Sequence, residues 1–223
     1  MKNYKQLLFL IALINFFSFD ALGQLDRVNV ITRKEAKTLI KDVKKEAKRI
    51  KKDGFNNIAG DEVVERQLTR SYEKALEEDE NGYSRYIVGN AQVVSGSQAG
   101  AKISAEELIR LSVSARIQSN FTAILETQLA NEQINASEAA TIQKTVAASK
   151  NIISLKLGRQ VRLTEFYSRN EKNRTWEIVL RLGYDEKMAQ KMAVNALKKQ
   201  LKEESSELAD QLDDILDLSN SDN

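Results

Sequence analysis

The sequence predicts a helix-rich α+β protein with an antiparallel three-stranded sheet, made of one strand, two helices and then a β-hairpin, with flanking N- and C-terminal helices. Three observations lead to this prediction. Apolar residues recur at three- and four-residue spacing in several segments, which indicates amphipathic helices. The spacing changes to two in residues 159–168 and 174–184, which indicates a hairpin. Residues 83–94 are rich in Tyr, Ile and Val, which favours a further strand.

The first 23 residues have the features of a secretory signal peptide. Lys2 and Lys5 supply positive charge, residues 7–19 are mostly apolar, and the small residues Ala21 and Gly23 fit a cleavage site. The apolar run is shorter than the roughly 20 residues of a membrane span, although an uncleaved anchor is the alternative. We therefore expect an exported protein whose mature chain begins at Gln24. It would be located in the periplasm, at the outer membrane or outside the cell.

The composition excludes several classes of function. The chain has no Cys and no His, so disulfides, thiolate catalysis, a Ser-His-Asp triad and Cys or His metal sites cannot form. A lipid anchor on Cys is excluded as well, and a secreted chain without disulfides favours a bacterial source. The net charge of +2 gives no overall nucleic-acid footprint. We expect no enzymatic activity, no cofactor and no nucleic-acid partner.

Residues 24–82 are predicted to form an antiparallel pair of helices. Thr32 and Glu35 fit a capping box that opens the first helix, and Gly54 fits its end. Its apolar positions are Ala36, Ile40, Val43, Ala47 and Ile50, and its other faces are crowded with lysines. Such a helix either binds membranes or anionic polymers, or is a solvated helix packed on a partner. The second helix, from Asp61 to about Glu78, is acidic towards its end.

Residues 83–202 are predicted to form the core domain with its closing helix. Gly89 in the first strand indicates a bulge or a close approach. Ser104 fits the start of a long helix that runs to about residue 131, and Ser137 the start of a second that runs to about residue 154. Asp185 fits the cap of the closing helix. Apolar residues climb the long helix in steps of four, at Ile109, Val113, Ile117, Phe121 and Leu125.

The hairpin carries the charged residues of most interest. Alternation predicts that the face carrying Trp176 is covered by helices and that the other face is exposed, with Arg162 and Arg181 on it. Those arginines could bind an anionic partner or discourage edge aggregation. Glu165 and Glu177 are the only acidic candidates on the sheet for carboxylate catalysis, and they could equally pair with arginines across strands.

Residues 203–223 form an acidic C-terminal tail without any basic residue. Asp210, Asp213, Asp214 and Asp217 would share one side of a helix, where loose divalent binding is one interpretation. A soluble tail, or a tail that docks on the basic first helix, is the alternative. Self-association through the oppositely charged ends follows as a prediction.

Part of the chain resembles a known family. Residues 86–91 (Tyr-Ile-Val-Gly-Asn-Ala), the helix through Ala115 and residues 176–185 (Trp-Glu-Ile-Val-Leu-Arg-Leu-Gly-Tyr-Asp) are similar to the domain shared by LPP-type bacterial surface lipoproteins and the N-terminal part of flagellar assembly protein FlgT. The resemblance covers about residues 83–186. It implies an envelope component that binds or scaffolds other proteins. The lipid-bearing Cys of those lipoproteins is missing here, and the charged terminal helices lie outside the resemblance.

Three functions are consistent with these observations. The first is a non-enzymatic, exported cell-envelope protein that acts through contact with other envelope proteins or with itself, with peripheral membrane contact as an addition. The second is a binder of, or carboxylate-based enzyme for, an envelope polymer such as peptidoglycan. The third is a carrier of a small apolar ligand between sheet and helices.

Overall fold

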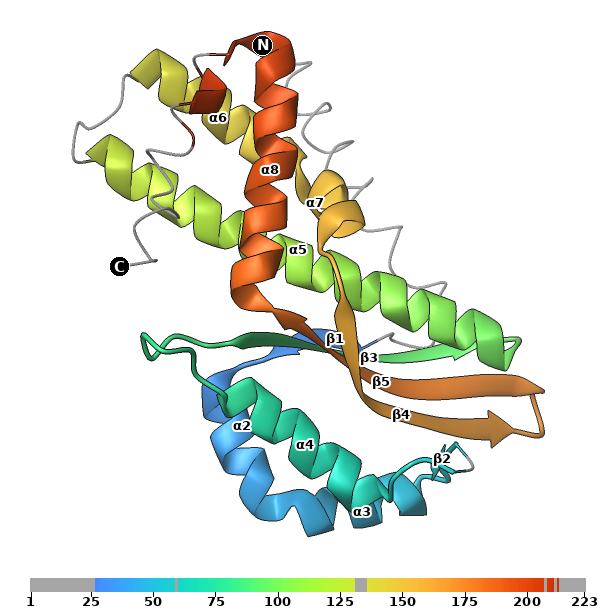
Figure 1. The fold of residues 1–223 in the computed structure, drawn as a ribbon. Helices are drawn as coiled ribbons and strands as arrows, with labels where there is room; N and C mark the ends of the chain where they lie inside the picture. Colours follow the sequence, from blue (N-terminus) through green and yellow to red (C-terminus); the bar gives the residue numbers. More distant parts are fainter. Residues whose placement is uncertain (1–26, 59, 131–135, 207, 211, 213–223) are drawn as a thin grey trace, which may run out of the picture.

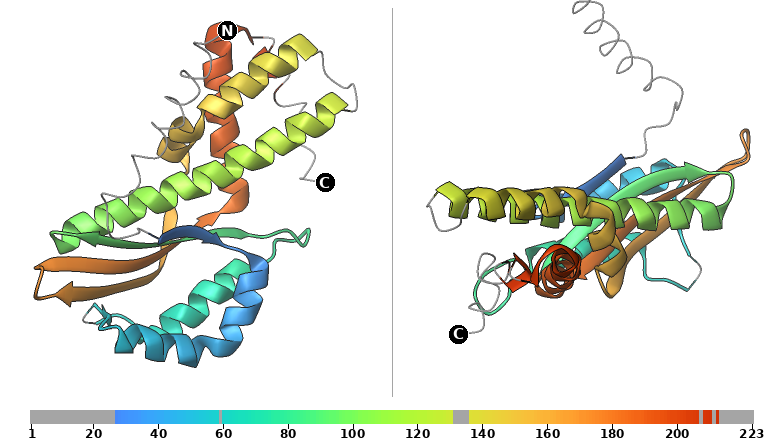
Figure 2. Two further views of the ribbon diagram at one scale, coloured as in Figure 1. Left: turned by 180° about the vertical axis from the view of Figure 1, so that it is seen from behind. Right: turned by 90° about the horizontal axis from the view of Figure 1, so that it is seen from above.

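A five-stranded antiparallel sheet lies between two layers of helices (Figure 1). The computed structural model describes residues 27–58, 60–130, 136–206, 208–210 and 212. Helices from residues 98–204, the C-terminal layer, cover one face of the sheet, and helices from residues 33–76, the N-terminal layer, cover the other (Figure 2). Each layer has its own hydrophobic core against the sheet.

The sheet confirms the α+β class and corrects the number of strands. Its order is β1 (Arg27–Ile31), β3 (Tyr86–Ser95), β5 (Thr175–Asp185), β4 (Gln160–Asn170) and β2 (Asn56–Asn57), with every neighbouring pair antiparallel. The prediction of three strands was wrong because β1 and β2 add the two edges. β2 has two residues, too few to show a two-residue period, and β1 is a five-residue strand directly before the capping box that the sequence does reveal.

The C-terminal layer is built on α5 (Gln98–Ala130), with α6 (Ala136–Ala148), α7 (Lys150–Lys156) and α8 (Glu186–Glu204) beside it. The predicted stripe of α5 is confirmed, since all five apolar positions are at most 1% exposed. The helix begins at Gln98, so Ser104 does not cap it. The second predicted helix is interrupted at Ser149, whose hydroxyl donates to the carbonyl of Val146 at 2.6 Å. Asp185 caps α8 as predicted and accepts from the Met188 amide at 2.9 Å.

The N-terminal layer consists of α2 (Arg33–Leu39), η1 (Ile40–Asp42), α3 (Val43–Lys52) and α4 (Val64–Leu76). The capping box of Thr32 and Glu35 is confirmed. Gly54, at φ 83°, ends α3, and the Phe55 amide donates to the carbonyl of Ile50 at 3.1 Å, as in a Schellman motif. Local sequence signals therefore predicted both ends of this basic segment correctly.

The two predicted N-terminal helices are antiparallel, as expected. Lys51 at the end of α3 pairs with Glu65 near the start of α4, at 2.9 Å, and Arg33 pairs with Glu78 at the opposite ends. The second helix is shorter than predicted, and Asp61 does not cap it. The carboxylate of Asp61 instead binds Arg162 of β4.

A β-bulge interrupts the alternation of β4. The register with β5 shifts between Arg162 and Thr164. Leu163 therefore packs in the core of the N-terminal layer, whereas Tyr167 packs in the core of the C-terminal layer. A strict two-residue alternation would place Leu163, Glu165 and Tyr167 on one face, but the one inserted residue moves every later side chain to the opposite face.

Gly89 marks a close approach of α5 to β3 rather than a bulge. A Cβ atom at Gly89 would lie 2.4 Å from Cγ2 of Ile109. We expect Gly89→Ala to lower the free energy of unfolding by about 1–3 kcal/mol, measured by urea denaturation. Gly96→Ala is the matched control, because a Cβ there meets nothing within 4 Å. Equal stability of the two variants would contradict the close approach.

Candidate functional site

A polar trough lies between α3 and the central strands β3 and β5. It consists of two hollows, of about 340 Å³ and about 490 Å³, that share Asp53 as a lining residue. One wall is the last two turns of α3, with Arg49 and Lys52, and the floor includes Asn90 and Gln92 of β3. The larger hollow continues to the tip of the β4–β5 hairpin. The trough exists because α3 packs mainly on α4 and leaves this part of the sheet open.

Arg181 lies on the floor of the trough and is almost fully buried, at 6% exposure. Its guanidinium donates to Glu46 Oε1 at 2.8 Å, to Ser71 Oγ at 2.9 Å and to Asn90 Oδ1 at 3.2 Å. The group also lies 4.8 Å from the centre of the Tyr72 ring. Tyr72 donates its hydroxyl to Glu46, and burial raises the pKa of this phenol, which keeps the donor protonated.

The prediction that Arg181 lies on an exposed face was wrong, because the N-terminal layer covers that face. Its partners were not identified from the sequence. One signal was available: Glu46 falls on the same side of the helix as Val43, Ala47 and Ile50, all three of which are buried. A carboxylate on a buried helix face requires a charged or hydrogen-bonding partner. The partner lies 135 residues further along the chain, and no local pattern identifies it.

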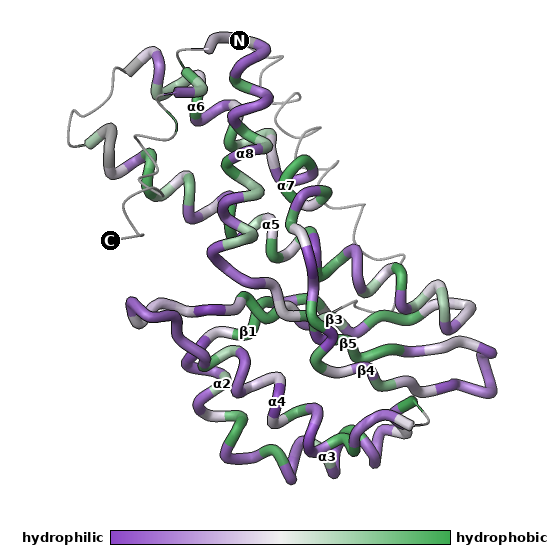
Figure 3. Tube along the Cα trace, viewed as in Figure 1, coloured by the Kyte–Doolittle hydropathy of each residue, from purple (hydrophilic) through white to green (hydrophobic). Residues whose placement is uncertain are grey.

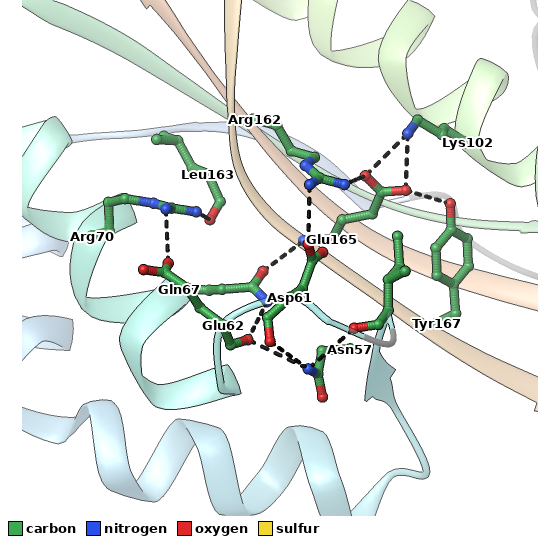
Figure 4. A network of polar contacts seen from close by, with 11 residues as sticks. Asn57, Asp61, Glu62, Gln67, Arg70, Lys102, Arg162, Leu163, Glu165 and Tyr167 are labelled. Atoms are coloured by element: carbon green, nitrogen blue, oxygen red, sulfur yellow. Dashed lines mark hydrogen bonds and ion pairs between the residues drawn. The ribbon is translucent and has the colours of Figure 1, made fainter.

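A second polar cluster surrounds Glu165 on the other face of the sheet, as Figure 4 shows. This carboxylate is 1% exposed and accepts from Lys102 Nζ at 3.0 and 3.1 Å, from Arg162 Nη1 at 2.9 Å and from the Tyr167 hydroxyl at 2.7 Å. Burial raises the pKa of Glu165, but the bonds from Tyr167, Arg162 and Lys102 outweigh it and hold the pKa below its usual range. Glu165 therefore stays ionised and is fully engaged.

The Glu165 cluster connects the sheet to both helix layers. Arg162 also binds Asp61 Oδ1 at 3.2 Å, and the Glu165 amide donates to Gln67 of α4 at 3.2 Å. Arg70 of α4 donates to the carbonyl of Leu163, at the bulge (Figure 4). These contacts come from α5, β4 and α4, so the cluster holds the two layers in place rather than presenting a reactive group.

Glu165 and Glu177 do not form a catalytic pair. Glu165 faces the C-terminal layer, whereas Glu177 lines the trough on the opposite face and accepts from Gln92 at 2.7 Å. Two carboxylates that hydrolyse a glycoside must flank the same bond. The sheet separates these two, so the arrangement offers no site for that reaction.

The N-terminal layer carries an exposed group of cations, which we call the cationic face. In Figure 3 hydrophilic residues dominate the tube through α2 and α3. Residues 33–53 hold ten basic and four acidic residues. Eight of the basic side chains are exposed and pair with no described residue. These eight are Lys34, Lys37, Lys41, Lys44, Lys45, Lys48, Arg49 and Lys52.

The other sequence-based candidates find no support within the described parts of the chain. Among those residues, no group of three or more acidic ligands is placed to hold a metal ion. Of the four aspartates proposed for divalent binding, only Asp210 is described, and Asp213, Asp214 and Asp217 lie outside the described residues. In the ranges that the structure describes, no helix is both long enough and apolar enough to span a bilayer.

No protein-family model, no curated protein and no solved structure matches the chain. The similarity to LPP-type lipoproteins and to FlgT, and the envelope location that it implies, therefore stay predictions. The polar trough and the adjoining cationic face are the candidate functional site on geometric grounds alone.

Proposed function

We propose that this protein is a non-enzymatic, exported cell-envelope component that acts by binding another protein through its cationic face. The unpaired charges of that face are the observation that supports the proposal. Eight like charges on one surface repel each other, and a partner of opposite charge converts this repulsion into attraction. The buried charges, in contrast, are already saturated by partners within the chain, as at Arg181 and Glu165.

The trough favours a polypeptide over a flat lipid surface as the partner. The apolar side of α3 is buried in the core, so this helix has no apolar face to insert into a bilayer. The trough is recessed, and its floor carries the side-chain amides of Asn90 and Gln92, which are held in place by bonds to Arg181 and Glu177. Fixed hydrogen-bonding groups in a recess can recognise a chain that enters it. Because Asp53 and Glu177 also line the trough, the attraction for an acidic segment of an envelope protein comes from the cationic face beside it.

A crosslinking pull-down from intact cells tests the proposal. We expect the native protein to capture a defined set of envelope proteins, and Lys44→Glu/Lys45→Glu/Lys48→Glu to lose them, because the reversed charges repel an acidic partner. The matched control reverses three exposed lysines of α8 in the opposite layer, Lys191→Glu/Lys199→Glu/Lys202→Glu. Capture of the same proteins by all three forms, or of polymer or lipid alone, would refute the proposal.

A further inference from the structure

We propose that the acidic segment 213–223 of one copy binds the polar trough and cationic face of a second copy. This inference rests on the proposed function, because it names a partner for the same surface. It goes further in that the partner is a specific segment of this chain. Three observations support it: the charge of the two surfaces, the lining of the trough and the place where the described chain ends.

The charges are complementary. Residues 213–223 contain no basic residue and four acidic ones, namely Asp213, Asp214, Asp217 and Asp222. The cationic face has eight exposed cations without a described partner. Each of the two surfaces repels itself, and this repulsion falls when the two surfaces meet.

The lining of the trough suits the composition of this segment. Residues 213–218 read Asp-Asp-Ile-Leu-Asp-Leu, so apolar side chains stand beside carboxylates. The smaller hollow likewise places Arg49 next to Ile50 and Val179. The hollows also carry four carboxylates, of which Glu46 is paired with Arg181 and Glu171 with Arg169, while Asp53 and Glu177 are the other two. Carboxylates of an entering segment therefore bind only at Arg49 and Lys52, while its leucines contact the apolar part of the wall. No other cation in the cationic face lines either hollow.

The position of residue 212 points to a second copy as the source of the segment. Ala209 and Leu212 are fully buried in the core of the C-terminal layer. The trough and the cationic face belong to the N-terminal layer, across the sheet. Figure 1 shows α8 on the opposite side of the sheet from α2 and α3. The chain after Leu212 therefore starts on the side of the molecule that faces away from its own trough.

This contact joins two different surfaces. Such a heterologous contact builds a ring or an open chain of copies, and a reciprocal exchange of segments builds a closed dimer. Both arrangements require the same segment-to-trough contact. Both also weaken at high salt, because the Debye length falls from about 10 Å at 0.1 M to about 3 Å at 1 M.

The first experiment measures the contact directly. The probe is a labelled peptide of residues 213–223, titrated into the chain of residues 24–212, which keeps the buried Ala209 and Leu212 in their own core. We expect saturable binding that weakens by on the order of tenfold or more with Arg49→Glu/Lys52→Glu, because both cations line the trough. Lys191→Glu/Lys199→Glu, on α8 in the opposite layer, is the matched control outside the proposed surface, and we expect a change of less than about threefold.

The second experiment asks whether the contact joins two copies. By size-exclusion chromatography with light scattering at low salt, the mature chain is expected to exceed the monomer mass. The chain that ends at Leu212 and the full-length Arg49→Glu/Lys52→Glu variant are each expected to be monomers. Mixed together they should form a complex, because one supplies an intact trough and the other an intact segment. Circular dichroism of each variant checks that it is folded.

Each remaining outcome overturns the inference. A mature chain that stays monomeric at all concentrations would overturn it. If that monomer also binds the peptide more tightly once its own residues 213–223 are removed, the segment occupies the trough of its own copy. Association that persists without residues 213–223 would overturn the inference as well. In these cases the proposed function still stands if the pull-down depends on Lys44, Lys45 and Lys48. It falls with the inference only if reversal of those charges has no effect on capture.

Discussion

Replacing Arg181 by methionine is expected to lower the free energy of unfolding by about 3–5 kcal/mol, because it leaves a buried carboxylate without its countercharge. The variant removes the donors to Glu46, Ser71 and Asn90 in a single change. Glu46 is itself only 10% exposed at its side chain, so water cannot replace the lost partner. Urea denaturation of the chain from Gln24 onward at neutral pH measures the effect.

Two further variants separate charge from packing. Arg169→Met removes an arginine of β4 whose side chain is 49% exposed, and we expect a loss of about 1 kcal/mol or less. Arg181→Met/Glu46→Leu removes both members of the buried pair, and we expect it to regain part of the stability that Arg181→Met loses. A cost of Arg181→Met no larger than that of Arg169→Met would contradict the buried pair.

Glu165→Gln is expected to lower the free energy of unfolding at pH 7 by about 2–4 kcal/mol, because charge-assisted bonds from Lys102 and Arg162 become weak or are lost. The loss is smaller than for Arg181, since those two cations are 38% and 47% exposed at their side chains and can be hydrated. Tyr167 keeps an acceptor in the amide oxygen.

The effect of Glu165→Gln should depend on pH. The folded state holds the pKa of Glu165 below its unfolded value of 4.5, so its ionised form stabilises the fold above that pH. This stabilisation is lost as the pH falls through the lower, folded pKa. The stability difference between the native chain and Glu165→Gln should therefore be largest at neutral pH and shrink in strong acid. Denaturation curves across this range that run parallel for the two proteins would refute the assignment.

The sequence predicted those features that depend on neighbouring residues. The capping box at Thr32, the end of α3 at Gly54 and the buried stripe of α5 are set by contacts a few residues apart, and all were read correctly. The hairpin of β4 and β5 and its turn were predicted for the same reason.

Features that depend on distant contacts were missed. The layer of α2–α4 covers the second face of the sheet, and its contact with Arg181 joins residues more than one hundred positions apart. Glu165 and Glu177 lie on opposite faces because the hairpin register pairs Glu165 with Leu180 and Glu177 with Ser168, and the sequence alone did not reveal this register. Of the candidate site, the cationic residues were visible in the sequence, but the trough beside them was not.

The strand order has a consequence for how the chain acquires its structure. β5 is the last strand to be synthesised, yet it lies between β3 and β4, which do not pair with each other. Until residues 175–185 are available, β1–β3 and β2–β4 are two separate ribbons. Such late, non-local pairing slows folding compared with a sheet of sequential hairpins. A nascent chain thus completes its sheet only after about four-fifths of it has been made, and until then it stays open to binding by chaperones.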